Sequence, residues 1–120
     1  MVDGNKSSKF NIYFYKTASG KETVLSFINS FDEDTKVKIR NGIRLLGGYG
    51  LLLMNTPWMK KVYKDPSIYE LRIRSKVEVR LLFFLVKPNN FVFVHGFVKK
   101  TNKLPKQDLQ LAIKRCKEFI

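Results

Sequence analysis

Charged and large apolar residues alternate strictly through one short stretch, Tyr69-Glu70-Leu71-Arg72-Ile73-Arg74. Successive side chains of a strand point to opposite faces, so this stretch predicts a strand with one apolar side and one charged side. Val79-Arg80-Leu81 repeats the pattern, and His95-Gly96-Phe97-Val98-Lys99-Lys100-Thr101 ends in a basic cluster. The sequence therefore predicts a sheet with a hydrophobic layer on one side and cations on the other.

The patterns elsewhere in the chain predict the element order β-α-α-β-β-β-α. Aromatic and β-branched residues indicate a first strand, and apolar residues at helical spacing indicate two helices after it. The second of these helices begins at the acids Asp32 to Asp34 and is expected to end at Gly47-Gly48, because glycine tolerates the left-handed cap conformation. Pro105 opens a last helix. The expected ranges are 10–15, 20–31, 32–48, 67–74, 77–87, 91–99 and 105–119, with an irregular connection over 49–66.

The last three of the expected strands follow one another closely and predict an antiparallel meander. We therefore expect an α+β fold, with a mostly antiparallel four-stranded sheet, two N-terminal helices and one C-terminal helix. The length of 120 residues suits a single domain, taken as residues 9–120 after a polar, flexible N-terminus at 1–8.

Positive charge is concentrated in one part of the chain. The sequence has 23 Lys and Arg against 10 Asp and Glu, for a net charge of +13. Between Trp58 and Lys106 there are 12 basic and 3 acidic residues, so +9 of the +13 falls there. This concentration predicts an anionic partner and salt-sensitive association, against the alternative of a basic surface kept for solubility.

Cysteine and histidine usage narrows the chemistry. One cysteine, Cys116, excludes an internal disulfide and lies on an apolar helical stripe, where a packed thiol is expected. One histidine, His95, argues against a histidine-based metal site, and we expect no metal and no cofactor. The longest apolar run, Leu81–Val86, is too short to span a bilayer, and no signal peptide is evident. We expect a soluble, cytoplasmic protein with no membrane partner.

The arginines are the first candidates for a site, because a guanidinium group matches two phosphate oxygens and stays charged. If the first hairpin turn contains an odd number of residues, one face of the sheet carries Arg72, Arg74, Glu78 and Arg80. A shift of the strand register by one residue would move Arg80 to the other face. Glu70 is interpreted as an ion-pair partner of the arginines, with a role as general base as the alternative.

Further candidates flank this cluster. Lys99, Lys100 and Lys103 follow the third strand of the meander and would close the same groove. Tyr69, Phe97 and Trp58 would stack an unpaired base if they are not core residues. Lys60, Lys61 and Lys64 would contact RNA or form a solvated loop. His95, with Phe93 and Phe97 as expected same-face neighbours, is either a core residue or an acid–base catalyst.

RNA cleavage in such a groove is chemically possible without a metal. The ribose 2′-oxygen attacks the adjacent phosphorus, which gives a cyclic phosphate and a free 5′-hydroxyl. The protein must orient the attack, stabilise the added negative charge and move two protons. The same groove would also suit nucleic-acid binding without cleavage, and composition does not separate the two.

The quoted segments, with Pro105 and the basic helix after it, resemble the RelE/ParE superfamily of toxins over residues 10–119, and most closely its HigB-like, phage-derived branch. The resemblance implies a type II toxin that acts as a ribosome-dependent endoribonuclease on messenger RNA. Arg72, Arg74 and Arg80 would grip phosphate and stabilise the transition state, and Lys99 or Lys100 would supply another catalytic cation.

The resemblance also implies partners. These are the ribosome, messenger RNA and a cognate HigA-like helix-turn-helix antitoxin, through which alone operator DNA would be bound. A ParE-like inhibitor of DNA gyrase and a non-catalytic RNA-binding module are the alternatives. Some relatives carry lysine where Glu70 stands, and others place a tyrosine at the start of the last helix, so the general acid and base stay open.

Overall fold

The computed structural model describes residues 9–119, and the expected flexible terminus at 1–8 lies outside them. Within the described residues the chain forms a five-stranded sheet with three α-helices. The elements are β1 (Asn11–Phe14), α2 (Thr23–Asn29), α3 (Glu33–Tyr49), a 3₁₀ turn (Gly50–Leu53), β2 (Met59–Lys64), β3 (Ser67–Arg74), β4 (Glu78–Val86), β5 (Asn90–Lys99) and α4 (Lys106–Lys117).

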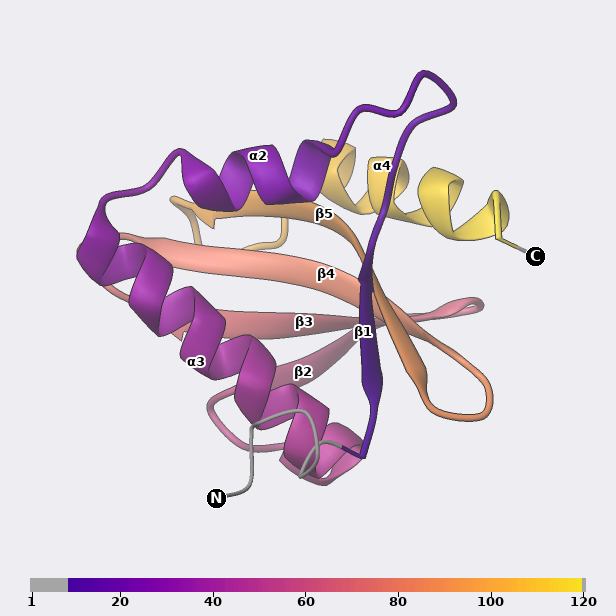
Figure 1. The fold of residues 1–120 in the computed structure, drawn as a ribbon, viewed down its shortest axis with the longest axis horizontal. Helices are drawn as coiled ribbons and strands as arrows, with labels where there is room; N and C mark the ends of the chain where they lie inside the picture. Colours follow the sequence, from indigo (N-terminus) through magenta and orange to yellow (C-terminus); the bar gives the residue numbers. More distant parts are fainter. Residues whose placement is uncertain (1–8, 120) are drawn as a thin grey trace.

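The sheet has the strand order β1-β5-β4-β3-β2. Strands β2 to β5 form antiparallel pairs, whereas β1 runs parallel to β5 at one edge (Figure 1). The α+β class and the meander of β3, β4 and β5 are confirmed, but the expectation of four strands is wrong. The additional strand is β2, which lies inside the segment that the sequence presented as an irregular connection.

Strand β2 was missed because its sequence, Met-Lys-Lys-Val-Tyr-Lys, has no apolar alternation. Only Met59 is buried, and it pairs with Leu71. Lysines on an edge strand keep its open side in water and discourage pairing with another chain. An edge strand of this kind is held by backbone hydrogen bonds to its neighbour, which composition does not reveal.

Two hydrophobic layers cover the two faces of the sheet. Helices α2 and α3 pack on one face, which we call the helical face, and bury the larger core around Leu71, Leu81 and Phe83 (Figure 1). Helix α4 packs on the opposite face through Ala112 and Cys116. Because α4 covers only part of that opposite face, the remainder carries the charged residues described below.

The ends of α3 show what the sequence predicted and what it did not. Asp32 is the N-cap, and its carboxylate accepts a hydrogen bond from the Thr35 amide at 3.1 Å, as the acidic start suggested. The predicted end at Gly47-Gly48 is wrong, because the helix continues to Tyr49. Gly50 takes the positive φ of 56°, and a Cβ there would lie 2.3 Å from the ring of Phe10.

A β-bulge changes the register between β4 and β5. Leu82 pairs with His95, whereas the next residue, Phe83, pairs with Phe93. The extra residue on β5, Val94, places Phe93 on the helical face and His95 on the other. The expectation that Phe93 neighbours His95 on one face is therefore wrong.

No helix within residues 9–119 is long and apolar enough to cross a bilayer.

Candidate functional site

The charged side of β3 and β4 carries all three predicted arginines. Directly paired residues of antiparallel strands share a face. Arg72 lies opposite Arg80, and Arg74 lies opposite Glu78. The turn between the strands is Ser75-Lys76-Val77, closed by a hydrogen bond from the Ser75 amide to the Val77 carbonyl at 3.0 Å. The odd number of turn residues gives the register for which the arginines share one face.

Neighbouring strands extend this arrangement on both sides. On β5, Lys99 lies opposite Glu78 and Phe97 lies opposite Arg80, while on β2 Lys60 lies opposite Glu70. We call this surface the basic face. Its five cations stand against two carboxylates, an excess of three positive charges. The residues of the basic face are Lys60, Glu70, Arg72, Arg74, Glu78, Arg80 and Lys99.

Glu70 is the residue that holds two of the guanidinium groups together. Its Oε1 lies 3.1 Å from Nε of Arg72 and 3.6 Å from Nε of Arg80, and its side chain is only 2% exposed. Like charges directly opposite each other destabilise a sheet, so a carboxylate between Arg72 and Arg80 offsets their repulsion. Buried and engaged with two cations, Glu70 suits the role of ion-pair partner better than that of general base.

Arg80 is covered, which the sequence did not anticipate. Its side chain is 7% exposed, whereas that of Arg72 is 24% and that of Arg74 is 76% exposed. One terminal nitrogen of Arg80 donates to Glu78 at 3.1 Å and the other to the Val79 carbonyl at 3.2 Å. Its Nε is in ion-pair range of Glu70 but makes no hydrogen bond to any described residue. The arginines therefore share a face, but only Arg72 and Arg74 reach solvent.

His95 belongs to a pair formed between β5 and the start of α4. Its Nε2 lies 2.5 Å from Oδ1 of Asp108, and both side chains are mostly buried. A carboxylate hydrogen-bonded to one ring nitrogen fixes the orientation of an imidazole and leaves the other nitrogen for proton transfer. The rings of His95 and Phe97 stack at 6.0 Å between centroids, and Arg80 is a diagonal neighbour of His95 on the sheet. The sequence did not point to Asp108, since only the return of α4 across β5 brings it close.

The other predicted RNA-contacting residues, and Lys100, which was predicted to be catalytic, do not all lie on the basic face. Tyr69 is buried in the core of the helical face, stacked on a phenylalanine, so its ring is not open to a base. Lys60 is the one lysine of β2 on the basic face, because Lys61 lies opposite Tyr69. The remaining lysines are exposed but lie outside the basic face: Lys64 at the end of β2, and Lys100 and Lys103 after β5.

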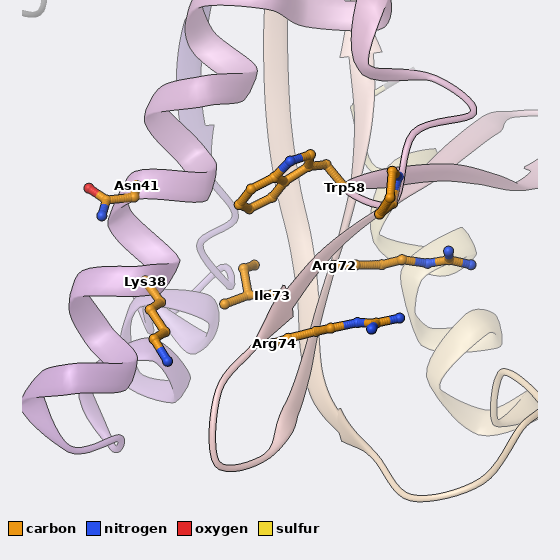
Figure 2. A pocket seen from close by; sticks show the side chains of 7 residues that line it. Lys38, Asn41, Trp58, Arg72, Ile73 and Arg74 are labelled. Carbon is orange, nitrogen blue, oxygen red and sulfur yellow. The ribbon is translucent and has the colours of Figure 1, made fainter.

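An open pocket lies beside the basic face, at the edge of β3 (Figure 2). Its volume is about 420 Å³. The Arg72 amide donates to the Trp58 carbonyl at 2.8 Å, which fixes the start of β2 against β3. The sequence analysis singled out Trp58 but missed Lys38 and Asn41 of α3, because polar residues on a helix usually form its solvent-exposed face. The pocket is lined by Lys38, Asn41, Pro57, Trp58, Arg72, Ile73 and Arg74.

Cys116 lies on the buried side of α4, where burial raises the pKa of its thiol to about 12. A thiol with such a pKa stays protonated near neutral pH and is a poor nucleophile. Among residues 9–119, no group of three or more His, Cys, Asp or Glu side chains is arranged to hold a metal ion.

Comparison with known protein families shows which family the chain matches. The model of a family described as "Phage derived protein Gp49-like (DUF891)" matches residues 26–117, which include α3, the four antiparallel strands and α4. No curated protein matches the chain. The matched region contains every residue of the basic face and of the pocket at the edge of β3.

Proposed function

Since the chain belongs to the phage-derived Gp49-like family, a RelE-like toxin family, we propose that it is the toxin of a type II toxin–antitoxin system. In this proposal it is an endoribonuclease that cuts messenger RNA on the ribosome and so stops translation. The toxin would be of the HigB-like type, would act on the ribosome and would be neutralised by a cognate antitoxin.

The basic face is the observation that carries the proposal. Three arginines and a lysine from consecutive strands lie within one surface of a rigid sheet, on β3, β4 and β5. Rigid placement matters, because cations fixed before the reaction stabilise developing charge without reorganising. Arg74 and Arg72 offer the exposed guanidinium groups that a phosphate would meet first.

The proposed reaction is an in-line displacement at phosphorus. The 2′-oxygen forms a bond to phosphorus while the bond from phosphorus to the 5′-oxygen breaks, so the products are a cyclic phosphate and a 5′-hydroxyl. A base takes the proton of the 2′-hydroxyl, and an acid protonates the leaving oxygen. Arg72 and Arg74 would hold the phosphate oxygens, with Lys99 at the side of β5, and the added charge would be stabilised by Arg80 behind them.

Arg80 requires a change of partner to act in this way. Its terminal nitrogen is bonded to Glu78, an exposed carboxylate near the end of the hairpin. A phosphate that displaces Glu78 would give Arg80 a charge-assisted partner and would release Glu78 to solvent. Glu70 would keep Arg80 in place throughout, because its own contacts are buried.

His95 is the proposed proton carrier. Among the described ionisable residues near Arg80, it combines a ring oriented by Asp108 with a position diagonal to Arg80 on the same face. Glu70 is then a positioning residue. Because the His95 ring lies close to the start of α4, the 5′-oxygen that leaves phosphorus would have to approach His95 along the edge of α4.

An antitoxin would neutralise the toxin by covering the basic face or by making the complex too large for the ribosome. The excess of positive charge on this face favours an acidic partner segment. Such a partner would be of the HigA-like helix-turn-helix type. Because it would cover the basic face of the toxin, operator DNA would be bound by the antitoxin alone.

Primer extension on messenger RNA after a pulse of expression tests the function. Wild-type protein should produce cuts within codons. Arg80→Ala should abolish them, while Lys87→Ala, which removes a distant exposed cation at the β4–β5 turn, should leave them unchanged. Intact messages with accumulating DNA breaks would favour gyrase inhibition instead, and cuts that persist in Arg80→Ala would refute the role assigned to this arginine.

A further inference from the structure

The pocket at the edge of β3 continues from the basic face around the side of the sheet. Pairing between β2 and β3 begins at Met59 and Leu71, so Ile73 and Arg74 lie beyond the strand-paired part of this edge. In Figure 2, Arg72 and Arg74 extend side by side away from α3, whereas the ring of Trp58 lies between β3 and α3 near Ile73. Arg72 and Arg74 therefore help to line an aromatic pocket, while their guanidinium groups point away from α3.

The chemistry of the pocket differs from that of the basic face. Trp58 is 40% exposed, unlike the other aromatic candidates, Tyr69 and Phe97, which are buried. Asn41 and Lys38 extend from α3, and their side chains make no hydrogen bond or ion pair with any residue from 9 to 119. A ring with an open side, an amide that both donates and accepts, and an ammonium group thus line a single hollow.

We propose that this pocket holds one unpaired nucleobase of the RNA strand whose phosphate lies on the basic face. The base would stack on Trp58, and the Asn41 amide, which points away from Trp58 in Figure 2, would turn to bond the edge of the base. Phosphates on either side of it would meet Arg72 and Arg74 at one end and Lys38 at the other. The volume of about 420 Å³ leaves room for one base and its ribose.

This inference rests on the proposed function in one respect: the bound nucleic acid is taken to be the RNA substrate. Binding is nevertheless measurable without cleavage. Trp58 is the only tryptophan of the chain, so its fluorescence reports on this pocket alone. A stacked base quenches indole emission, whereas a phosphate bound at the arginines leaves the ring uncovered.

The first experiment titrates the whole protein with a single-stranded RNA hexanucleotide and with an abasic oligomer of the same length. We expect the RNA to quench Trp58 and the abasic oligomer to bind with little quenching. Equal quenching by the two oligomers would overturn the proposal. Quenching by the antitoxin but not by RNA would also overturn it, since the pocket would then belong to a protein interface.

The second experiment measures binding of labelled RNA to variants by anisotropy. Trp58→Ala should weaken binding by roughly 5- to 150-fold, the range for loss of one stacked base. Asn41→Ala, on the exposed side of α3, should weaken it less. Tyr13→Ala, which removes an exposed ring at the opposite edge of the sheet, is the control and should bind as wild type.

Wild-type affinity in a folded Trp58→Ala would refute the pocket. Circular dichroism shows whether Trp58→Ala is folded, and Asn41→Ala carries the test if it is not. The two proposals fail separately. If RNA quenches Trp58 but no message is cut, the base pocket stands and the nuclease does not. If messages are cut but Trp58→Ala binds and cuts as wild type, only the pocket is wrong.

Discussion

Glu70→Gln gives the sharpest test of how the basic face is held together. Glutamine keeps the shape of the side chain and one acceptor oxygen but removes the negative charge between Arg72 and Arg80. Glu70 is 2% exposed and Arg80 is 7% exposed, so the charge that remains on Arg80 loses a buried partner. Breaking a buried pair by removing one charge costs about 3–5 kcal/mol.

The structure places the expected cost at the lower end of that range. Arg80 keeps its bond to Glu78 at 3.1 Å, and Arg72, at 24% exposure, regains hydration when its partner is lost. We therefore expect the free energy of unfolding to fall by about 3 kcal/mol in Glu70→Gln. For a domain of this size the melting temperature should fall by roughly 10 °C.

Urea denaturation followed by circular dichroism measures this change, with Glu78→Gln as the matched control. Glu78 is also paired with Arg80, but its side chain is 41% exposed. An ion pair to such a group contributes about 1 kcal/mol or less, so Glu78→Gln should be nearly as stable as the wild type. Equal stability of Glu70→Gln and wild type, or an equal loss in both variants, would refute this account of the arginines.

Three further predictions concern the scaffold. Gly96→Ala should lower stability by about 1–3 kcal/mol in urea denaturation, because its Cβ would lie 2.5 Å from a side chain of α2, whereas Gly48→Ala meets no neighbour and should not destabilise. The bond to Lys76, with the N-cap bond, holds the pKa of Asp32 well below its ordinary value of 3.8, so wild type should melt above Asp32→Asn at pH 7, and that advantage should fade as acid titration continues below pH 3.8. Cys116 should resist alkylation at pH 8 until urea unfolds the chain, and rapid labelling of the folded protein would contradict its burial.

Alternation in β3, the apolar runs of β4 and β5 and the polar turns between them were enough to predict the meander. Alternation left the shared face of Arg72, Arg74 and Arg80 conditional on the length of one turn, and the three-residue turn of the structure places them together. Alternation did not reveal β2, whose lysines contact solvent and whose pairing is made by the backbone. The bulge at Val94 was also hidden, because one inserted residue leaves the composition of β5 unchanged.

The site was harder to predict than the fold for a related reason. Burial of Arg80 depends on neighbouring strands and on where its carboxylate partners lie, and none of these distances follows from spacing along one strand. The partner of His95, Asp108, lies on a helix that crosses the sheet. Asn41 and Lys38 reach the pocket of Trp58 from α3. Such contacts join elements far apart in sequence, where periodicity carries no information.

Cleavage of a defined message on purified ribosomes tests the central claim most directly. Wild-type protein is added to ribosomes stalled with a known codon in the decoding site, alongside Arg72→Ala/Arg74→Ala and the control Lys87→Ala. The account predicts cuts at that codon by wild type and control, and none by the double variant, which removes both exposed guanidinium groups of the basic face. An uncut message with wild-type protein, or equal cutting by the double variant, would contradict it.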